Sequence, residues 1–519
     1  MVASSTDTAE IHRTRLFSGI CLALIPTGAS FALVSNILVQ LKQEFILTNY
    51  QVGLIAGAAL WGMAISLLVL GPALEGFGLK NGARMAFVGH IAGITLMISA
   101  VTQVGDAAAF WILMLGAATL AVGNGLIEVA GNPLVAALYP EQKTTRLNYF
   151  HAFFPIGIVA GGLTGFVLAN YGGALARWPF QLAVIYVPIL IYGYMVLPQR
   201  FPKTENAEAG LPVGEMFRFT LTSPLFLLIL VAMGVAISLE LGPMRWIPAV
   251  LQSAGMHGIL VLVWTSGWMV VLRLLAHHFV DRLSPTGMLM SSGVLLFTGL
   301  FLLSFATGLW TALGAATLFA WGVAFNFPTI VGLVSERLPR TGSLGIVLTA
   351  GVGLGSAGAI GVPLMGKIAD TYLARALPAE QTLAVLRTAD ERFPAYIAHV
   401  ESVGVAAAGY RAADVHQALE ATRTALAEHA RTGSVQNDAT ANALRAISAA
   451  PLSNEPVVGE AAATVTPAEL AGGQRSFRYI APAAIVMILV FGTMYLNDRR
   501  RGGYRAERLE HRRETVSAR

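Results

Sequence analysis

Residues 111–138 read WILMLGAATLAVGNGLIEVAGNPLVAAL, an apolar run long enough to form a membrane-spanning helix. Glu128 is the one charged residue in it, with Asn124 four positions before and Asn132 four positions after. Residues spaced by four share one face of a helix, so these three polar side chains form a stripe. A carboxyl group at membrane depth is costly unless it is protonated, paired or in contact with a water-filled cavity. We interpret Glu128 as a solute or ion site; a structural acid paired with another helix is the alternative.

The composition of the whole chain is also that of a membrane protein. Of its 519 residues 55% are hydrophobic and 12% are charged, which is about half the charged fraction of a soluble protein. The 54 glycines suit the close packing of helices in lipid. Cys21 is the single cysteine, so it forms no intrachain disulfide, and we expect it to be a small core residue.

Hydropathy divides the chain into spans of the length that a bilayer requires. The first of these spans has no small-residue cleavage site, so we expect it to be a membrane-spanning helix and not a signal peptide. The predicted spans are 16–40, 50–74, 84–104, 109–138, 148–170, 178–198, 222–250, 257–280, 287–306, 309–334, 343–369 and 478–497. The predicted fold class is therefore an all-α membrane protein of twelve helices.

A polar stretch separates the first six spans from the last six. We predict an N-terminal lobe over residues 1–198, a linker over 199–218 and a C-terminal lobe over 219–519. The halves resemble each other, because the fourth and tenth spans both contain a proline and precede basic residues and a glycine-rich span. Repeated halves are the plan of many transporters, in which the solute binds at the midplane between them.

Lys and Arg residues gather in the short loops on one side and in the tail 498–519, which places this side and both termini in the cytoplasm. Residues 371–476 form a connection far longer than usual, and alternate crossing puts it on the external side. Its first part has helical character, whereas residues 448–460 and 466–473 are predicted to be a flexible return. We expect a tolerated surface insertion; a lid or a partner-docking module is the alternative.

The stretch GLIEVAGNPLVAALYPEQKTTRLNYFHAFFPIGIVAGG, residues 125–162, resembles the fucose permease-like sugar:proton symporters of the major facilitator superfamily. In that family a helix carries Glu and then Asn-Pro, and a cytoplasmic loop ending in Arg-Leu-Asn leads into a helix with spaced glycines. The matching positions are Glu128, Asn132, Pro133, Arg146, Leu147, Asn148, Gly157 and Gly161. Residues 237–251, with Glu240, and 325–345, with Asn326, are also similar to that family. The resemblance implies the twelve-helix, two-lobed fold and transport by alternating access.

Loops of the superfamily carry an acidic and basic signature after the second and eighth helices. The second copy here is RLLAHHFVDRLSPTG at 273–287, and the first, GPALEGFGLKNGAR at 71–84, is degenerate. Such acids can pair with an Arg of another helix or with a helix N-terminus and hold one conformation. The resemblance implies a conformational latch, and ordinary charged loops are the alternative. The latch candidates are Glu75, Arg273, Asp281 and Arg282.

Two positions depart from the family. The first span of these symporters carries an Asn-Asp pair, whose Asp takes part in proton coupling, but this chain has Asn36 there and an amide cannot titrate. We expect Asn36 to face the same cavity as Glu128. The fifth span has His151 and Phe154 where the family presents Gln and Asn to sugar hydroxyls. Glu128 and His151 are the expected proton carriers, since a desolvated carboxyl group can hold a proton and His titrates near neutrality.

Further candidates lie in the second half. Glu240 is a predicted solute ligand, and Gly242-Pro243 is expected to interrupt its helix. Trp264 and Trp268 lie four apart and could pack on a sugar ring, with plain packing as the alternative. The full set of predicted substrate-binding residues is Asn36, Asn124, Glu128, Asn132, His151, Glu240, Trp264, Trp268 and Asn326.

These observations predict a secondary active transporter that moves a monosaccharide or related small polar solute together with protons. The alternatives are an uncoupled facilitated carrier, a transporter of another small organic solute such as an anion held by Arg245, and a transporter-like receptor. The sequence has no phosphate-binding loop and no nucleophile-base or metal-ligand set, so neither an ATP-driven pump nor an enzyme is expected. We expect no cofactor, metal or nucleic-acid partner. The expected partners are the solute, protons and the lipid bilayer, for a monomer in a bacterial inner membrane.

Overall fold

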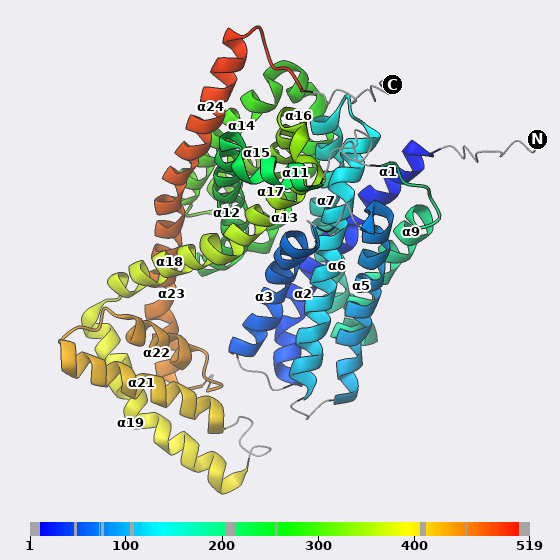
Figure 1. The fold of residues 1–519 in the computed structure, drawn as a ribbon. Helices are drawn as coiled ribbons and strands as arrows, with labels where there is room; N and C mark the ends of the chain where they lie inside the picture. Colours follow the sequence, from blue (N-terminus) through cyan, green and yellow to red (C-terminus); the bar gives the residue numbers. More distant parts are fainter. Residues whose placement is uncertain are drawn as a thin grey trace, which may run out of the picture.

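The computed structural model describes residues 11–45, 49–71, 73, 77–103, 108–203, 213–254, 258–404, 412–452 and 454–507. These residues form helices and contain no strand (Figure 1). Ten helices in this part of the chain are long and apolar enough to cross a membrane. Two shorter apolar segments, Leu60–Leu70 and Val261–Leu274, lie where the second and eighth spans were predicted. The predicted all-α membrane fold is confirmed, and the ten long helices with these two shorter segments agree with the twelve predicted spans.

The N-terminal lobe contains the first six spans. Its first span consists of two helices in sequence, and its second ends in a π-helical turn, Ser66–Leu70. Its helices are α1 (Arg13–Leu22), α2 (Leu24–Glu44), α3 (Asn49–Ile65), α5 (Leu79–Ser99), α6 (Ala108–Leu138), α7 (Lys143–Tyr171), α8 (Trp178–Ala183) and α9 (Tyr186–Val196). Helices α5 and α6 pack along each other, as do α2 and α7 (Figure 1).

The C-terminal lobe contains the last six spans and a short helix, α11 (Val213–Thr222), which lies partly in the predicted linker. Its membrane helices are α12 (Pro224–Ser253), α13 (Gly258–Leu274), α14 (Ala276–Leu303), α15 (Leu309–Val323), α16 (Asn326–Arg337), α17 (Gly342–Ser356), α18 (Val362–Ala376) and α24 (Ala484–Arg500). We call the end of the bundle where α24 ends and α7 begins the terminal face, and the opposite end the insertion face (Figure 1).

The predicted break at Gly242-Pro243 is wrong, because α12 is continuous from Pro224 to Ser253. Membrane helices tolerate proline where neighbouring helices cover the freed backbone. Gly242 here lies against α18, since an added Cβ would be 3.1 Å from Met365 Sδ. In an unbroken helix Glu240 and Arg245 lie about 140° apart, so they point to different neighbours.

The ninth span begins differently from the prediction. The eighth span ends at Leu274, and residues 276–283 form a short helical segment before a sharp bend at Ser284. Ser284 has φ 62°, a left-handed conformation that is uncommon for residues other than glycine, and Pro285 follows it. The bend separates residues 276–283, at the terminal face, from the membrane-spanning part of α14.

The long connection between the last two spans is a helical bundle of its own. It contains α19 (Ala379–Val403), α21 (Ala412–Thr432), α22 (Asp438–Ser448) and α23 (Pro456–Ile480), and it projects from the insertion face (Figure 1). Its buried residues form a separate hydrophobic cluster that includes Leu386, Phe393, Leu419, Leu444 and Ile447. The insertion therefore has its own core.

The predicted flexible return at residues 466–473 is wrong, because these residues lie inside α23. Gly472 places the α23 backbone directly on α18, where an added Cβ would be 2.3 Å from Ala369 O. Small residues allow this close approach of two helices. In addition, Arg445 of α22 contacts Asp370 of α18 and Glu469 of α23, both at 3.0 Å. Residues 466–473 are thus part of a helix, α23, that packs against α18.

Glycines bring α7 into direct contact with α2. An added Cβ at Gly157 would lie 2.5 Å from Ile25 O, and one at Gly161 would lie 2.8 Å from Ala29 Cα. This approach fixes the position of α7 in the N-terminal lobe. It places Phe154, which precedes these glycines, beside α2.

We expect Gly157→Ala to destabilise the protein by about 1–3 kcal/mol, because the added methyl group overlaps the α2 backbone. The matched control is Gly162→Ala, since the nearest atom to an added Cβ there is Ala32 Cβ at 4.0 Å. The measurement is the thermal unfolding temperature of the purified protein in detergent. Equal unfolding temperatures for the two variants would show that α7 and α2 are not tightly packed.

Candidate functional site

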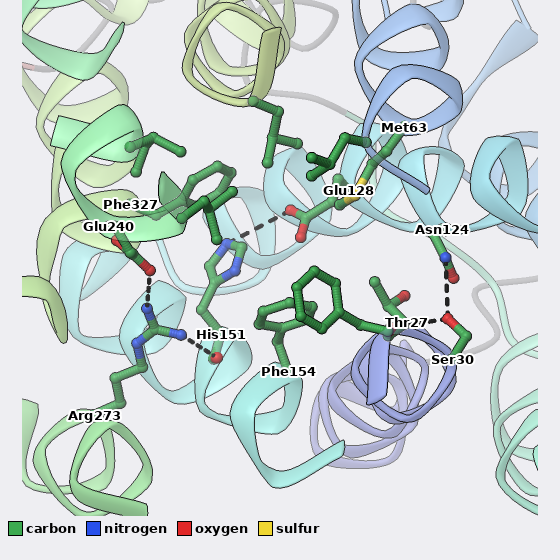
Figure 2. Close-up of a pocket in the computed structure, with 15 residues that line it drawn as sticks. Thr27, Ser30, Met63, Asn124, Glu128, His151, Phe154, Glu240, Arg273 and Phe327 are labelled. Carbon is green, nitrogen blue, oxygen red and sulfur yellow. Dashed lines mark hydrogen bonds and ion pairs between the residues drawn. The ribbon is translucent and has the colours of Figure 1, made fainter. Parts of the chain in front are cut away.

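A cavity of about 60 Å³ lies between the two lobes (Figure 2). It is lined from the N-terminal lobe by Thr27, Ser30, Phe31, Leu60, Met63, Asn124, Glu128, His151 and Phe154, and from the C-terminal lobe by Ile237, Glu240, Leu241, Arg273, Phe327 and Leu354. Ligand pockets for small organic molecules usually measure about 300–1,000 Å³. The structure therefore shows this cavity in a contracted state, with room only for water.

Glu128, Asn132 and His151 form one hydrogen-bonded group. Asn132 Nδ2 donates to Glu128 Oε2 at 2.6 Å, which confirms the contact expected from their spacing of four on α6. Asn132 Oδ1 lies 2.7 Å from His151 Nε2, and His151 Nε2 lies 3.7 Å from Glu128 Oε2. Because an amide oxygen only accepts, His151 carries its hydrogen on Nε2. All three residues are buried, and Figure 2 shows His151 pointing toward Glu128.

Asn124, the third residue of the stripe, is held by His90, a histidine that the sequence analysis did not link to it. His90 Nε2 lies 3.0 Å from Asn124 Oδ1, and His90 Nδ1 lies 2.9 Å from the Tyr192 hydroxyl. His90 must donate to the amide oxygen, so Nδ1 accepts from Tyr192. Asn124 Nδ2 donates to Ser30 Oγ at 3.3 Å. This series of hydrogen bonds fixes the Asn124 amide at the cavity wall and connects α2, α5, α6 and α9.

Arg273 lies in the cavity and joins the two lobes. Its Nη1 donates to the carbonyl oxygen of His151 in the N-terminal lobe at 2.7 Å, and its Nε donates to Ala324 O at 2.6 Å. Its Nη2 lies 3.6 Å from Glu240 Oε1 (Figure 2). A buried guanidinium needs acceptors for its donors and a balancing charge; the two carbonyl oxygens supply acceptors, and Glu240 supplies the charge. Arg273 thus belongs to the wall of the cavity and not to the loop signature in which the sequence placed it.

The cavity is closed toward the terminal face by contacts between α7 and α16. Thr144 donates to Glu336 Oε1 from its backbone nitrogen at 3.0 Å and from its hydroxyl at 2.8 Å. Asn148 Nδ2 donates to Thr329 Oγ1 at 3.2 Å. Thr144, Asn148 and His151 lie on one side of α7, so this helix contacts the C-terminal lobe from the terminal face up to the cavity.

The last described residues of the chain cover these contacts between α7 and α16. The Tyr504 hydroxyl donates to Glu336 Oε2 at 2.6 Å, and burial, together with the Glu336 carboxylate, raises the pKa of Tyr504 so that it stays protonated. Arg337 pairs with Asp498, and Asp498 also accepts from Thr286 Oγ1 at 3.0 Å. Glu336 and Asp498 were not among the residues predicted from the sequence, because charged residues are common at the ends of membrane spans.

Of the other predicted latch residues, Glu75 lies outside the described residues. Asp281 and Arg282 are exposed on the segment before the bend at Ser284. They line a second cavity of about 670 Å³ at the terminal face, together with Glu336 and Asp498. Asp281 makes no ion pair with any residue that the structure describes. A latch role for these residues stays a prediction.

Several predicted ligands lie away from the central cavity. The expectation that Asn36 faces it is not met, because Asn36 Nδ2 donates to Gln181 Oε1 at 2.9 Å and Asn36 does not line the cavity. Trp264 is 43% exposed and donates to Thr317 Oγ1 at 2.8 Å, and Trp268 packs between Trp264 and Trp321. Asn326 is fully buried next to the cavity residue Phe327 but does not line it.

The aromatic side chains that do line the cavity are three phenylalanines, Phe31, Phe154 and Phe327. The rings of Phe31 and Phe154 meet edge to face, with centroids 6.2 Å apart. Arg245, which does not line the cavity, lies with its guanidinium carbon 3.7 Å from the centre of the Phe31 ring. Phe154 stands at a position that the family resemblance had singled out, whereas only the structure identifies Phe31 and Phe327 as cavity residues.

We expect Arg273→Met to destabilise the protein by about 3–5 kcal/mol, because it leaves the Glu240 carboxylate buried without a counter-ion. The double variant Arg273→Met, Glu240→Gln should recover part of this loss, since the amide carries no charge. Thermal unfolding in detergent compares the two variants with the wild type. If the double variant unfolds at the same temperature as Arg273→Met, the pair contributes no electrostatic stabilisation.

Comparison with curated proteins found partial similarity to several transporters. The chain is 27% identical to the L-fucose-proton symporter of Escherichia coli over 157 residues, which are 30% of this chain and 35% of the symporter. It is 28% identical to the cis,cis-muconate transport protein of Acinetobacter baylyi over 180 residues, 34% of this chain and 41% of that protein. The chain therefore matches less than half the length of these relatives.

Among solved structures, the transporter FucP in the outward conformation matches with a TM-score of 0.56 and 20% identity, over 68% of this chain and 92% of FucP. The human organic anion transporter MFSD10 matches with a TM-score of 0.54 and 12% identity. The match covers 93% of this chain and 100% of MFSD10. At these identities the likeness shows the shared fold. The family model of the Major Facilitator Superfamily matches residues 20–362, more than half of the chain. The two-lobed bundle with its central cavity thus belongs to a member of the Major Facilitator Superfamily, an integral membrane transporter.

Proposed function

We propose that this transporter moves a monosaccharide or a related small polar solute by alternating access, together with protons. The observation that carries the proposal is the position of Glu128, a buried carboxyl group that lines the cavity between the lobes. Its hydrogen-bond donor is the Asn132 amide, and its nearest titratable neighbour is His151. A carboxyl group held by a neutral donor in a cavity can gain and lose a proton as the cavity opens to either side.

The relatives and the cavity support this proposal in two ways. One relative in sequence is by name an L-fucose-proton symporter, and the stretch around Glu128 carries the strongest resemblance to that family. The cavity combines phenyl rings with hydroxyl, amide and carboxyl groups, which suits a solute with apolar C–H faces and several hydroxyl groups. Contacts seal the terminal face, so the contracted cavity must open toward the insertion face before a solute can enter.

The setting that we propose is a bacterial inner membrane, with both termini and the terminal face in the cytoplasm and the insertion outside. The Lys and Arg residues of the short loops support this orientation. The proposed organisation is an N-terminal lobe to residue 198, a linker to 218 and a C-terminal lobe with the insertion, acting as a monomer. The solute and the proton would then enter from the insertion face.

We expect Glu128→Gln to abolish accumulation against a gradient while exchange of pre-loaded solute continues, because the amide keeps the shape and cannot titrate. Proteoliposomes with an imposed proton gradient measure accumulation, and counterflow without a gradient measures exchange. The control is Glu401→Gln, an exposed acid of α19. Unchanged accumulation by Glu128→Gln would falsify the proton role of Glu128.

Uncoupled facilitated transport is the second candidate, and the observation that favours it is Asn36. The acid that the related symporters carry in the first span is absent, and the Asn36 amide is bonded to Gln181 instead of facing the cavity. An uncoupled carrier would show no difference between Glu128→Gln and wild type in either assay. Accumulation driven by the proton gradient in the wild type would exclude it.

We expect Asn36→Asp to leave the pH dependence of uptake unchanged, since the new carboxyl group would face Gln181 and not Glu128. The measurement is the initial uptake rate from about pH 5 to 8, where histidines and shifted carboxyl groups titrate. A steeper profile than that of the wild type would show that position 36 reaches the coupling site in another conformation of the transport cycle.

A further inference from the structure

Two buried oxygen atoms on different walls of the central cavity have no hydrogen-bond partner among the residues that the structure describes. One is Oγ1 of Thr27, on α2 of the N-terminal lobe, and the other is Oε2 of Glu240, on α12 of the C-terminal lobe. Thr27 is 3% exposed and Glu240 is 5% exposed. Figure 2 shows them on opposite sides of the cavity. Buried polar atoms are nearly always hydrogen-bonded, so both atoms need a partner that enters the cavity.

The vacancy at Thr27 is unusual for a threonine of a helix. Such hydroxyl groups commonly donate to the carbonyl oxygen four residues earlier. Several buried threonines of this protein do so, for example Thr265 Oγ1, 2.8 Å from Val261 O, and Thr349 Oγ1, 2.6 Å from Gly345 O. Thr27 makes no such bond, although its own carbonyl oxygen accepts from Ser30 Oγ at 2.9 Å. Its hydroxyl group is therefore available to a solute.

The vacancy at Glu240 follows from how Arg273 is held. The distance of 3.6 Å between Arg273 Nη2 and Glu240 Oε1 is an ion contact, longer than a hydrogen bond. Arg273 uses Nε and Nη1 on the two carbonyl oxygens of Ala324 and His151. The guanidinium therefore balances the charge of Glu240 and leaves Oε2 free to accept a hydrogen from another group.

We propose that Thr27 Oγ1 and Glu240 Oε2 form a hydroxyl-binding subsite that spans both lobes, and that the solute is a neutral molecule with several hydroxyl groups. This inference rests on the proposed transport function and names the chemistry that selects the solute. One hydroxyl group donates to Glu240, and another exchanges a hydrogen bond with Thr27. Phe31 and Phe154, which line the cavity, cover the apolar faces of the same molecule.

The charges around the cavity exclude ionic solutes of the same size. The carboxylate of an anionic solute would approach two carboxyl groups, Glu128 and Glu240, and a carboxylate oxygen has no hydrogen to donate to Glu240 Oε2. A cationic solute would meet Arg273, which lies in the cavity wall and already at Glu240. A hydroxyl group brings a donor without a charge, so it satisfies Oε2 without disturbing the Arg273 contact.

The first test uses sugars that differ only in charge. Proteoliposomes containing the full-length protein are given labelled neutral pentoses and hexoses, the matching uronates and the matching amino sugars, and initial uptake is compared with that of empty liposomes. We expect at least one neutral sugar to enter with kcat/KM at least tenfold above its uronate and its amino sugar. Faster uptake of a uronate or an amino sugar, or no uptake of any neutral sugar, would overturn the subsite.

The second test uses variants of the two residues. Thr27→Val should raise KM for the neutral sugar about tenfold, and Thr27→Ser should restore it, because only the hydroxyl group is needed. The matched control is Thr265→Val, a buried threonine outside the cavity whose hydroxyl is satisfied within its helix. Equal KM values for Thr27→Val and Thr265→Val would contradict the subsite, provided that both proteins elute as folded monodisperse species.

Glu240→Gln gives a change of selectivity that a merely structural role would not produce. The variant should raise KM for the neutral sugar about tenfold and narrow the preference over the uronate, since the repelling charge is gone. A uniform loss with unchanged preference would overturn the role of Glu240. The two proposals remain separable. Accumulation of a uronate that depends on Glu128 would support proton coupling and contradict the subsite. Entry of a neutral sugar without accumulation would support the subsite and contradict proton coupling.

Discussion

The direct packing of α7 on α2 is the constraint on which the rest of the site depends. Because Gly157 and Gly161 have no side chains, the backbones of the two helices touch, and α7 cannot rotate without a clash. Its opposite side then faces the C-terminal lobe with Thr144, Asn148 and His151. A single helix therefore fixes the position of the solute cavity on one side and closes the path to the terminal face on the other.

The membrane setting explains why the polar groups around the cavity form connected chains. Lipid offers no hydrogen bonds, so a buried polar atom must find its partner in the protein, in water or in a solute. Asn132 serves both Glu128 and His151, His90 serves both Asn124 and Tyr192, and Arg273 serves two carbonyl oxygens. Against this background of satisfied groups, the few vacant oxygens at the cavity wall stand out as places for a solute.

The fold and the centre of the site could be predicted from the sequence, because their signals are local. Span length and hydropathy gave the twelve helices, and the spacing of four between Glu128 and Asn132 gave a real contact. The contacts of Arg273 could not be predicted, since they join residues far apart in the chain and the boundary between α13 and α14 was uncertain. The same reason applies to Phe31 and Phe327 of the cavity and to His90, whose partners lie on other helices.

The prediction for residues 466–473 was also wrong, because the glycines and the proline there are typical of a flexible turn, whereas these residues are helical. In the structure α23 continues through the short turn Ala481–Ala483 into α24, and it is fastened to α18 by Arg445. The insertion is thus a stiff arm fixed to the C-terminal lobe, and the 25 residues of α23 alone extend about 37 Å. A lobe rotation of about 10° would swing the end of such an arm by roughly 6 Å, given that length. The arm converts a small rotation inside the membrane into a large displacement outside the bundle.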